Sequence, residues 1–236
     1  MRSCKTAPEL QALAEKNPGR LITLEADFTV EESVEILRQK IASMTSTLDQ
    51  VIYVAGVFIG LTAVTQVGLA ALKQNIEVNV YGAYSAAAAF SSFLLKSDYP
   101  NRVFVLFGSS FGSITTAKEN FDFHNAAFGT TGINATAVYD ISKVSYNSYQ
   151  ALTWRSFSDV LTKTAEARLA IEFDLELRPQ GVPFLLVHPG LVQTDMNNKG
   201  MISVDTSVDG LVNVIGKYSA ERKEKFLDYR GEELPW

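Results

Sequence analysis

Short apolar runs alternate along the chain with longer segments whose apolar residues recur at helical spacing. The short runs predict strands at residues 21–26, 51–55, 102–107 and 182–188. The longer segments predict helices at 9–15, at 29–44, at 67–93 with a bend near Gly82, and from about Tyr139 onward. Parallel strands need crossover connections, and buried parallel strands are apolar throughout. The pattern therefore predicts an α/β fold, a doubly wound parallel sheet with helices on both faces.

One uncharged stretch, residues 50–72, is long enough to cross a bilayer as a helix. However, Gly56 and Gly60 divide it, and no basic cluster flanks it. A strand at 51–55, a loop and the start of a helix explain the same residues. We favour this second interpretation and expect no membrane partner.

Composition excludes several other classes. The chain has 236 residues, of which 47% are apolar and 20% charged, with a net charge of −5. It is too apolar for a disordered chain, and it lacks the basic footprint of a nucleic-acid-binding protein. The single cysteine, Cys4, cannot form an internal disulfide, and no apolar segment of a signal peptide follows the N-terminus. We expect one domain over residues 1–236 in the cytoplasm.

Polar residues and glycines stand where the predicted strands end. They are Asp27, Gly56, Ser109 and the pair Pro189-Gly190. In open parallel sheets, ligands bind beyond the carboxyl ends of the strands. Taken singly, each of these residues could simply end a strand. Together they predict one shared site.

Tyr139 and Lys143 stand four residues apart, a spacing that places two side chains on one face of a helix. An ammonium beside a phenol favours the phenolate, so the tyrosine becomes usable as a general acid or base near neutral pH. A tyrosine and lysine at this spacing also occur on ordinary solvated helices. The order of the surrounding motifs favours a catalytic role for this pair over an ordinary solvated helix face.

Several short motifs occur in one order along the chain, and together they resemble the short-chain dehydrogenases/reductases. The resemblance is strongest to the C-factor-like and sniffer-like carbonyl reductases of fungi, and it covers most of residues 7–143 and 164–236. The motifs are Leu24-Glu25-Ala26-Asp27, Ala55-Gly56, Asn79-Val80-Tyr81-Gly82, Gly108-Ser109, Tyr139 with Lys143, and His188-Pro189-Gly190-Leu191-Val192-Gln193-Thr194-Asp195-Met196.

The resemblance implies an NAD(P)-dependent enzyme that interconverts a carbonyl and an alcohol on a small organic substrate. It implies that Tyr139 transfers the proton, that Lys143 lowers the pKa of Tyr139 and holds the nicotinamide ribose, and that Ser109 binds the substrate oxygen. Asn79 would support a relay water beside Lys143. The implied cofactor contacts are Asp27, Ala55, Gly56, Asn79, Tyr139, Lys143, Pro189, Val192 and Thr194. The resemblance favours NADP over NAD and allows a homo-oligomer.

The chain departs from this family in three places. No Gly-rich strand–turn–helix unit, which would bind the pyrophosphate, precedes Asp27. Residues 144–163 interrupt the family pattern after Lys143, and removing them joins Lys143 to Thr164 and restores it. This segment is interpreted either as a translated intron or as a surface loop. Ser109 and Tyr139 are 30 residues apart, which is more than in most of the family. We interpret residues 113–138 either as a loop that covers the substrate or as a second annotation artefact in the gene.

Two function classes follow. The first is the oxidoreductase just described. The second is a catalytically impaired remnant or interaction protein that keeps Ser109, Tyr139 and Lys143 but does not bind the dinucleotide. His124 and His188 lack metal-ligand spacing, so we predict no metal site.

Overall fold

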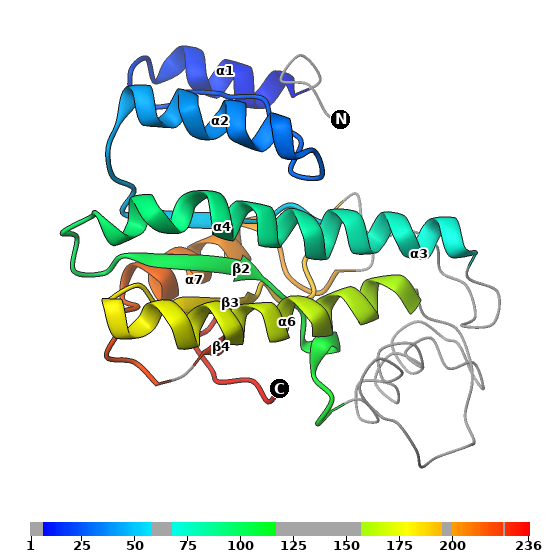
Figure 1. The fold of residues 1–236 in the computed structure, drawn as a ribbon. Coiled ribbons are helices and arrows are strands. Elements are labelled where there is room, and N and C mark those ends of the chain that lie inside the picture. Colours follow the sequence, from blue (N-terminus) through cyan, green and yellow to red (C-terminus); the bar gives the residue numbers. More distant parts are fainter. Residues whose placement is uncertain (1–6, 58–67, 117–156, 195–199, 224) are drawn as a thin grey trace.

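The computed structural model describes residues 7–57, 68–116, 157–194, 200–223 and 225–236 (Figure 1). Within these ranges, four parallel strands form one sheet in the order β1-β2-β3-β4. They are β1 (Gln50–Tyr53), β2 (Val103–Phe107), β3 (Phe184–His188) and β4 (Phe226–Asp228). The predicted parallel α/β sheet is confirmed.

Helices cover both faces of this sheet. The helices of the described residues are α1 (Pro8–Lys16), α2 (Glu31–Met44), α3 (Leu69–Asn75), the π-helical turn η3 (Ile76–Tyr81), α4 (Gly82–Leu95), α6 (Phe157–Leu177) and α7 (Val204–Gly216). Figure 1 shows α4 and α6 on one side of the strands and α7 on the other. Because side chains alternate along a strand, β2 sends Phe104 and Leu106 to the α4 and α6 side and Val103 and Val105 to the α7 side.

The core on the α4 and α6 side depends on aromatic stacking between neighbouring elements. The rings of Phe104 and Phe184 stack with centroids 4.7 Å apart, and Phe173 of α6 stacks on Phe184 at 5.1 Å. Offset stacking of this kind adds to the free energy gained from burying the rings. It fixes α6 against β2 and β3, and so fixes the position of any side chain that α6 presents at the end of the sheet.

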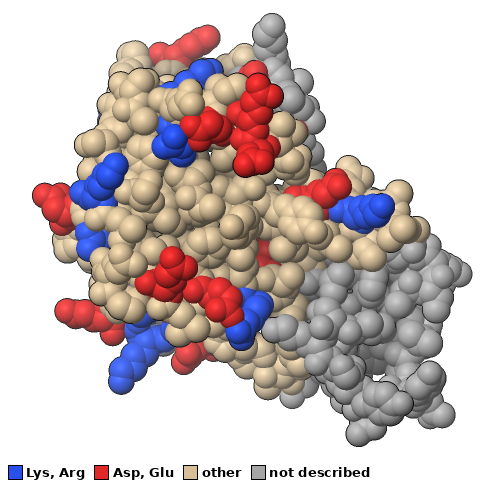
Figure 2. All heavy atoms as spheres, viewed as in Figure 1, with Lys and Arg blue, Asp and Glu red and all other residues tan. Residues whose placement is uncertain are grey.

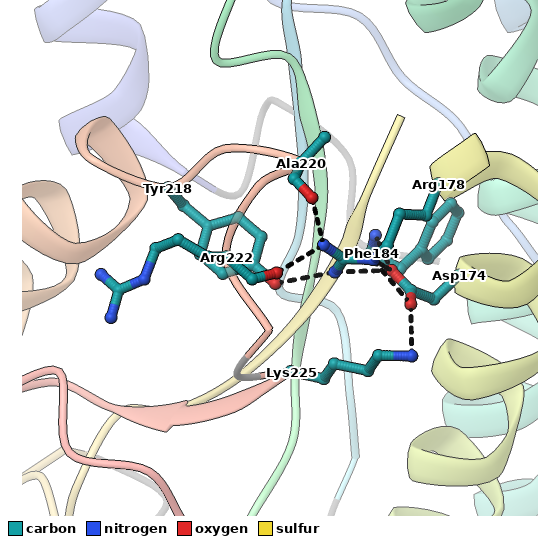
Figure 3. Close-up of polar contacts among 7 residues, drawn as sticks. All are labelled: Asp174, Arg178, Phe184, Tyr218, Ala220, Arg222 and Lys225. Carbon is teal, nitrogen blue, oxygen red and sulfur yellow. Dashed lines mark hydrogen bonds and ion pairs between the residues drawn. The ribbon is translucent and has the colours of Figure 1, made fainter. Parts of the chain in front are cut away.

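Charged side chains anchor the opposite end of α6. Asp174 is 1% exposed, and it accepts hydrogen bonds from Nε of Arg178 and from the backbone N–H of Phe184. Nζ of Lys225 lies 2.7 Å from the same carboxylate, as Figure 3 shows. Arg178 also donates to the carbonyl oxygens of Ala220 and Arg222 and to the hydroxyl of Tyr218, which holds the loop after α7 against the helix. Burial of this carboxylate is offset because every bond that it accepts comes from a cation or a backbone N–H.

Two of the strand predictions need correction. Residues 21–26 form no strand, because no other strand in the described parts of the chain lies beside them to form a ladder. The strand predicted as buried at 51–55 is the edge strand β1, in which Ile52 is 49% exposed, and the next residue but one, Val54, is 59% exposed. An edge strand has one unpaired side, so its side chains are covered less completely than those of β2 and β3.

The helices agree more closely with the sequence patterns. Helices α1 and α2 lie where they were predicted, and the helix predicted over 67–93 is formed by α3, the π-helical turn η3, which ends at Tyr81, and α4. A helix over 50–72 is excluded, since residues 50–53 form β1. Among the described residues, only the run Leu69–Leu95 has the length and composition of a membrane-crossing helix, and 44% of its apolar window is buried inside the protein.

The surface shows no strong segregation of charge on the face drawn in Figure 2. Lys and Arg side chains are interspersed with Asp and Glu, and the basic ones do not merge into a continuous patch there. This distribution agrees with the acidic net charge of −5. It gives this face no basic groove of the kind that tracks a phosphate backbone.

Candidate active site

The carboxyl ends of β1, β2 and β3 lie along one edge of the sheet because the three strands are parallel neighbours. Gly56 follows β1, Ser109 follows β2, and Pro189 follows β3 directly. The prediction that the strand ends share one edge is confirmed for these residues.

Asn79 is the buried centre of a polar cluster at this edge. It lies in η3 and is 0% exposed. Its Oδ1 accepts a hydrogen bond of 2.7 Å from the N–H of Val57, and its Nδ2 donates to the carbonyl of Val57 and, at 2.8 Å, to Oγ1 of Thr162. A π-helical turn inside an α-helix often marks a functional site. Here it brings the amide of Asn79 to the loop after β1 and to the start of α6.

Lys163 joins the same cluster from α6. Its ammonium donates to the carbonyl oxygen of Phe107, the last residue of β2, at 2.9 Å, and to Oε2 of Glu166 at 2.7 Å. The side chains of Lys163 and Glu166 are 14% and 3% exposed. A charged pair this well covered is held in one geometry, because its members would otherwise lose hydration without compensation.

Gly56 leaves an open corner beside these two side chains. A Cβ placed on Gly56 would lie 3.4 Å from Oδ1 of Asn79 and 3.7 Å from Nζ of Lys163. Without that carbon, the backbone after β1 borders the amide and the ammonium directly. Oδ1 of Asn79 and Nζ of Lys163 are therefore the polar side-chain atoms that lie next to the backbone of Gly56.

The lysine in this cluster is not the one that the resemblance implied. Tyr139 and Lys143 lie outside the described residues. Lys163 is the last residue of the segment 144–163, which we interpreted as an intron or a surface loop. Residues 157–163 instead form the first part of α6, and Thr162 is 0% exposed, so the surface-loop interpretation is wrong for these seven residues. Contacts with Asn79 and Phe107 stabilise a helix that the local composition does not favour.

Two serines follow β2, and the structure gives them different partners. The carbonyl oxygen of Ser109 accepts a bond of 2.7 Å from the N–H of Gly112, which closes the turn η4 (Ser110–Gly112). Oγ of Ser110 lies 3.4 Å from Nε2 of His188 at the end of β3. Burial lowers the pKa of His188 to about 4, although the charge of Asp228 partly opposes this shift. The imidazole is therefore neutral at pH 7.

Asp27 lies near the end of β1, because the ring of Phe28 packs edge-on against Tyr53 with centroids 5.5 Å apart. Its carboxylate accepts hydrogen bonds from the hydroxyl of Thr29 at 2.6 Å and from the N–H of Thr29 at 3.0 Å. These bonds hold the pKa of Asp27 below its ordinary value. A hollow beside it, of about 360 Å³, is lined by Asp27, Ser33, Ile36 and Lys40 among others.

The remaining predicted cofactor contacts lie on the loops after β1 and β3. Ala55 is exposed next to Gly56, and the carbonyl oxygen of Pro189 accepts a bond of 2.7 Å from the hydroxyl of Ser207 in α7. Val192 forms a parallel bridge with Ile202, and Thr194, two residues on, is exposed. The structure therefore places these residues at the strand-end edge, with Thr194 at its solvent side.

Sequence reasoning did not find Thr162, Lys163 and Glu166 as site residues. A signal was present, since Thr162-Lys163 repeats the hydroxyl–lysine pair Ser142-Lys143 and stands directly before Thr164. Metal chemistry finds no support in the described part of the chain, where no group of three or more His, Cys, Asp or Glu side chains is arranged to hold an ion.

Comparison with known proteins shows what the chain is similar to. Residues 2–116 match the family model of the short chain dehydrogenases. The C-signal protein of Myxococcus xanthus is 36% identical over 77 residues, which are 32% of this chain and 46% of that protein. The carbonyl reductase Sniffer of D. melanogaster has the same fold, with a TM-score of 0.78 at 22% identity over 100% of this chain and 86% of that one.

A carbonyl reductase from chicken fatty liver, solved with NADPH bound, superimposes with a TM-score of 0.76 at 22% identity, over 98% of this chain and 83% of that one. The match of residues 2–116 and the shared parallel fold make the chain similar to the short-chain dehydrogenases in its N-terminal half and in its architecture.

Proposed function

We propose that the protein interconverts a carbonyl and an alcohol on a small organic substrate, with NADP preferred to NAD. The observation that carries this proposal is the cluster of Gly56, Asn79 and Lys163 at the carboxyl ends of β1 and β2. This cluster places an amide and an ammonium at the edge where open parallel sheets bind ligands. The reductases that bind NADP or NADPH and share this fold support the choice of cofactor.

The cofactor, when bound, supplies or accepts a hydride. Asp27 would hold its adenine end and Ala55 and Gly56 its adenosine ribose, while the active-site lysine would hold the nicotinamide ribose and Asn79 would support a relay water beside that lysine. Pro189, Val192 and Thr194 would line the nicotinamide side. These assignments follow from the family resemblance, and they agree with the positions of the described residues at one edge of the sheet.

The chain's own chemistry is proton transfer and charge stabilisation at the substrate oxygen. In the reduction, the hydroxyl of Tyr139 gives its proton to the carbonyl oxygen as that oxygen gains negative charge. The hydroxyl of Ser109 donates a hydrogen bond to the same oxygen, where it counts most as charge develops. A lysine ammonium beside Tyr139 favours the phenolate that remains. The reverse reaction uses the same groups with the proton moving the other way.

A titration of the purified 236-residue chain with NADPH, followed by the fluorescence of the reduced nicotinamide, tests cofactor binding. Consumption of NADPH in the presence of aldehydes and ketones, with the alcohol product identified by mass spectrometry, tests the reaction. We expect saturable binding and turnover that Tyr139→Phe abolishes while binding persists. A chain that is folded by circular dichroism but binds neither NADPH nor NADH would overturn the proposal and favour the impaired-remnant alternative.

The same assay decides between the two serines. Removing one hydroxyl that stabilises the developing charge costs about a hundredfold in turnover. Ser109→Ala is expected to show this loss. Ser110→Ala is the matched variant, since its hydroxyl faces His188. If Ser110→Ala shows the loss instead, the substrate oxygen binds at Ser110.

A further inference from the structure

We propose that Lys163, and not Lys143, is the lysine of the active site in this chain, and that Glu166 is the residue that positions it. The role of this lysine in the reaction depends on the proposed oxidoreductase function. Its position in the site depends only on the contacts that the structure describes.

The contacts of Lys163 connect three elements of the site. Its Nζ binds the last carbonyl oxygen of β2, at Phe107, and a Cβ on Gly56 after β1 would lie 3.7 Å from that nitrogen. The residue before it, Thr162, accepts the hydrogen bond from Asn79. The helix α6 thus presents two consecutive residues to the ends of two strands and to the π-helical turn.

Glu166 fixes the direction of the ammonium. Its carboxylate is one turn further along α6, a spacing at which side chains meet, and Oε2 lies 2.7 Å from Nζ. With 3% of its side chain exposed, this carboxylate is shielded from water, so the pair is not loosened by solvent as a surface ion pair is. Glu166 therefore holds the lysine toward Phe107 and Gly56.

The position of Lys163 relative to Thr164 in the sequence explains how this lysine comes to lie in the site. Both Ser142-Lys143 and Thr162-Lys163 are a hydroxyl residue followed by lysine, and the second pair runs directly into Thr164. Helix α6 continues without interruption from Phe157 to Leu177, so the residues preceding Thr164 in the helix are Thr162 and Lys163. The segment 144–163 thus supplies its own hydroxyl and ammonium to the cluster.

This assignment changes the relation between the tyrosine and the lysine. In the pair Tyr139 and Lys143, a tyrosine stands four residues before the lysine. Four residues before Lys163, the helix carries Asp159 instead. Tyr139 stands 24 residues before Lys163, so helix geometry does not set the distance between them.

Competitive labelling of lysine amines with acetic anhydride, read by mass spectrometry on the full chain without cofactor, tests the position of Lys163. We expect Lys163 to react at least about tenfold more slowly than the exposed Lys217, because its nitrogen is bonded and covered. Glu166→Ala should raise the labelling rate of Lys163 without changing that of Lys217, and Glu166→Gln, which retains the shape, provides the same comparison if the alanine variant does not fold. Equal labelling rates for Lys163 and Lys217 in the unchanged chain would overturn the inference.

NADPH titration of Lys163→Met, Lys143→Met and the control Lys217→Met tests the role. We expect Lys163→Met to weaken binding by at least about tenfold, several times more than Lys143→Met does, with Lys217→Met unaffected. A larger loss in Lys143→Met than in Lys163→Met would refute the assignment. If the unchanged chain binds no NADPH, the proposed function fails, and the labelling result alone still decides whether Lys163 occupies the cluster.

Discussion

The side-chain amide of Asn79 donates a hydrogen bond of 2.8 Å to the hydroxyl of Thr162, across 83 residues of sequence. This bond joins the π-helical turn η3 to the start of α6 at the carboxyl edge of the sheet. Both side chains are fully buried. The amide of Asn79 also makes two bonds to Val57, so one side chain holds three segments of the site together.

Asn79→Ala is expected to lower the free energy of unfolding by about 2 kcal/mol, because it leaves buried polar groups of Val57 and Thr162 without this partner. Urea unfolding measures the change. A double-mutant cycle with Thr162→Val should give a coupling energy of about 1 kcal/mol for the pair. Asn101→Ala is the control: its side chain makes one long bond, of 3.3 Å, to Gly216. Strictly additive effects of the Asn79 and Thr162 changes would contradict the coupling.

Glu166→Gln and Glu172→Gln form a matched pair on α6. Glu166 binds Lys163 under cover of the protein, whereas the pair of Glu172 with Arg168 has side chains 53% and 54% exposed. Removing one partner of a covered ion pair costs about 3 kcal/mol, while an exposed pair contributes about 0.5 kcal/mol or less. Chemical unfolding of the two variants at low salt checks the difference. Equal destabilisation would show that the Lys163 pair is no better shielded than the surface one.

Asp174→Asn removes the charge at the centre of the network in Figure 3. Burial alone would raise the pKa of Asp174, but the hydrogen bonds from Arg178, Lys225 and the N–H of Phe184 outweigh it and hold the pKa below the ordinary value of 3.8. A carboxylate whose pKa is lower in the folded state stabilises the protein above its unfolded pKa, and this contribution is lost as the pH falls through the folded value.

We therefore expect Asp174→Asn to lower the free energy of unfolding at pH 7 by about 3 kcal/mol, since Arg178 and Lys225 lose their shared counter-charge. The difference from the unchanged chain should shrink as the pH is lowered below about 4. Urea midpoints measured across this range test both statements. A difference that stays constant down to pH 2 would mean that the charge of Asp174 is not what stabilises the network.

His188→Gln is expected to flatten part of the pH dependence of stability. Burial lowers the pKa of His188 from 6.5 to about 4, so between these values the unfolded chain binds a proton that the folded chain does not. Stability contributed by the neutral imidazole is present above pH 6.5 and is lost as the pH falls toward 4. The loss amounts to about 3 kcal/mol over this range. Thermal unfolding between pH 7 and 4.5 should show a steeper decline for the unchanged chain than for His188→Gln.

NMR titration of the imidazole provides an independent check. The ring signals of His188 should remain those of the neutral form down to about pH 5. A midpoint near 6.5 would show that the ring is hydrated and would remove the physical basis of the stability difference.

The strand and helix periods predicted the architecture because they depend on which residues must be buried. The apolar runs of β2 and β3 and the helical spacing in α2 and α4 are properties of neighbouring residues, and each was located within a few positions. The gathering of Gly56, Ser109 and Pro189 at one edge followed as well, since parallel strands bring their carboxyl ends to one side.

The secondary-structure predictions were wrong where local composition and long-range contacts favour different structures. Residues 21–26 have the apolar character of a strand, but no neighbouring strand in the described chain supplies the ladder. Residues 157–163 have a composition that disfavours a helix, yet the contacts of Thr162 and Lys163 with Asn79 and Phe107 hold them in one. Neither the missing strand at 21–26 nor the helix at 157–163 can be inferred from the neighbouring residues in the sequence.

By itself, the sequence determined the parallel α/β architecture and the set of residues that end its strands. Only the tertiary structure showed that Lys163 lies in the cluster that contains Asn79, because the tyrosine four residues before Lys143 made that other lysine the candidate in the sequence. The buried carboxylate of Glu166 and the carbonyl of Phe107, 56 residues away, hold Lys163 there. A hydrogen bond depends on distance in space, and that distance is set when α6 packs against the end of the sheet.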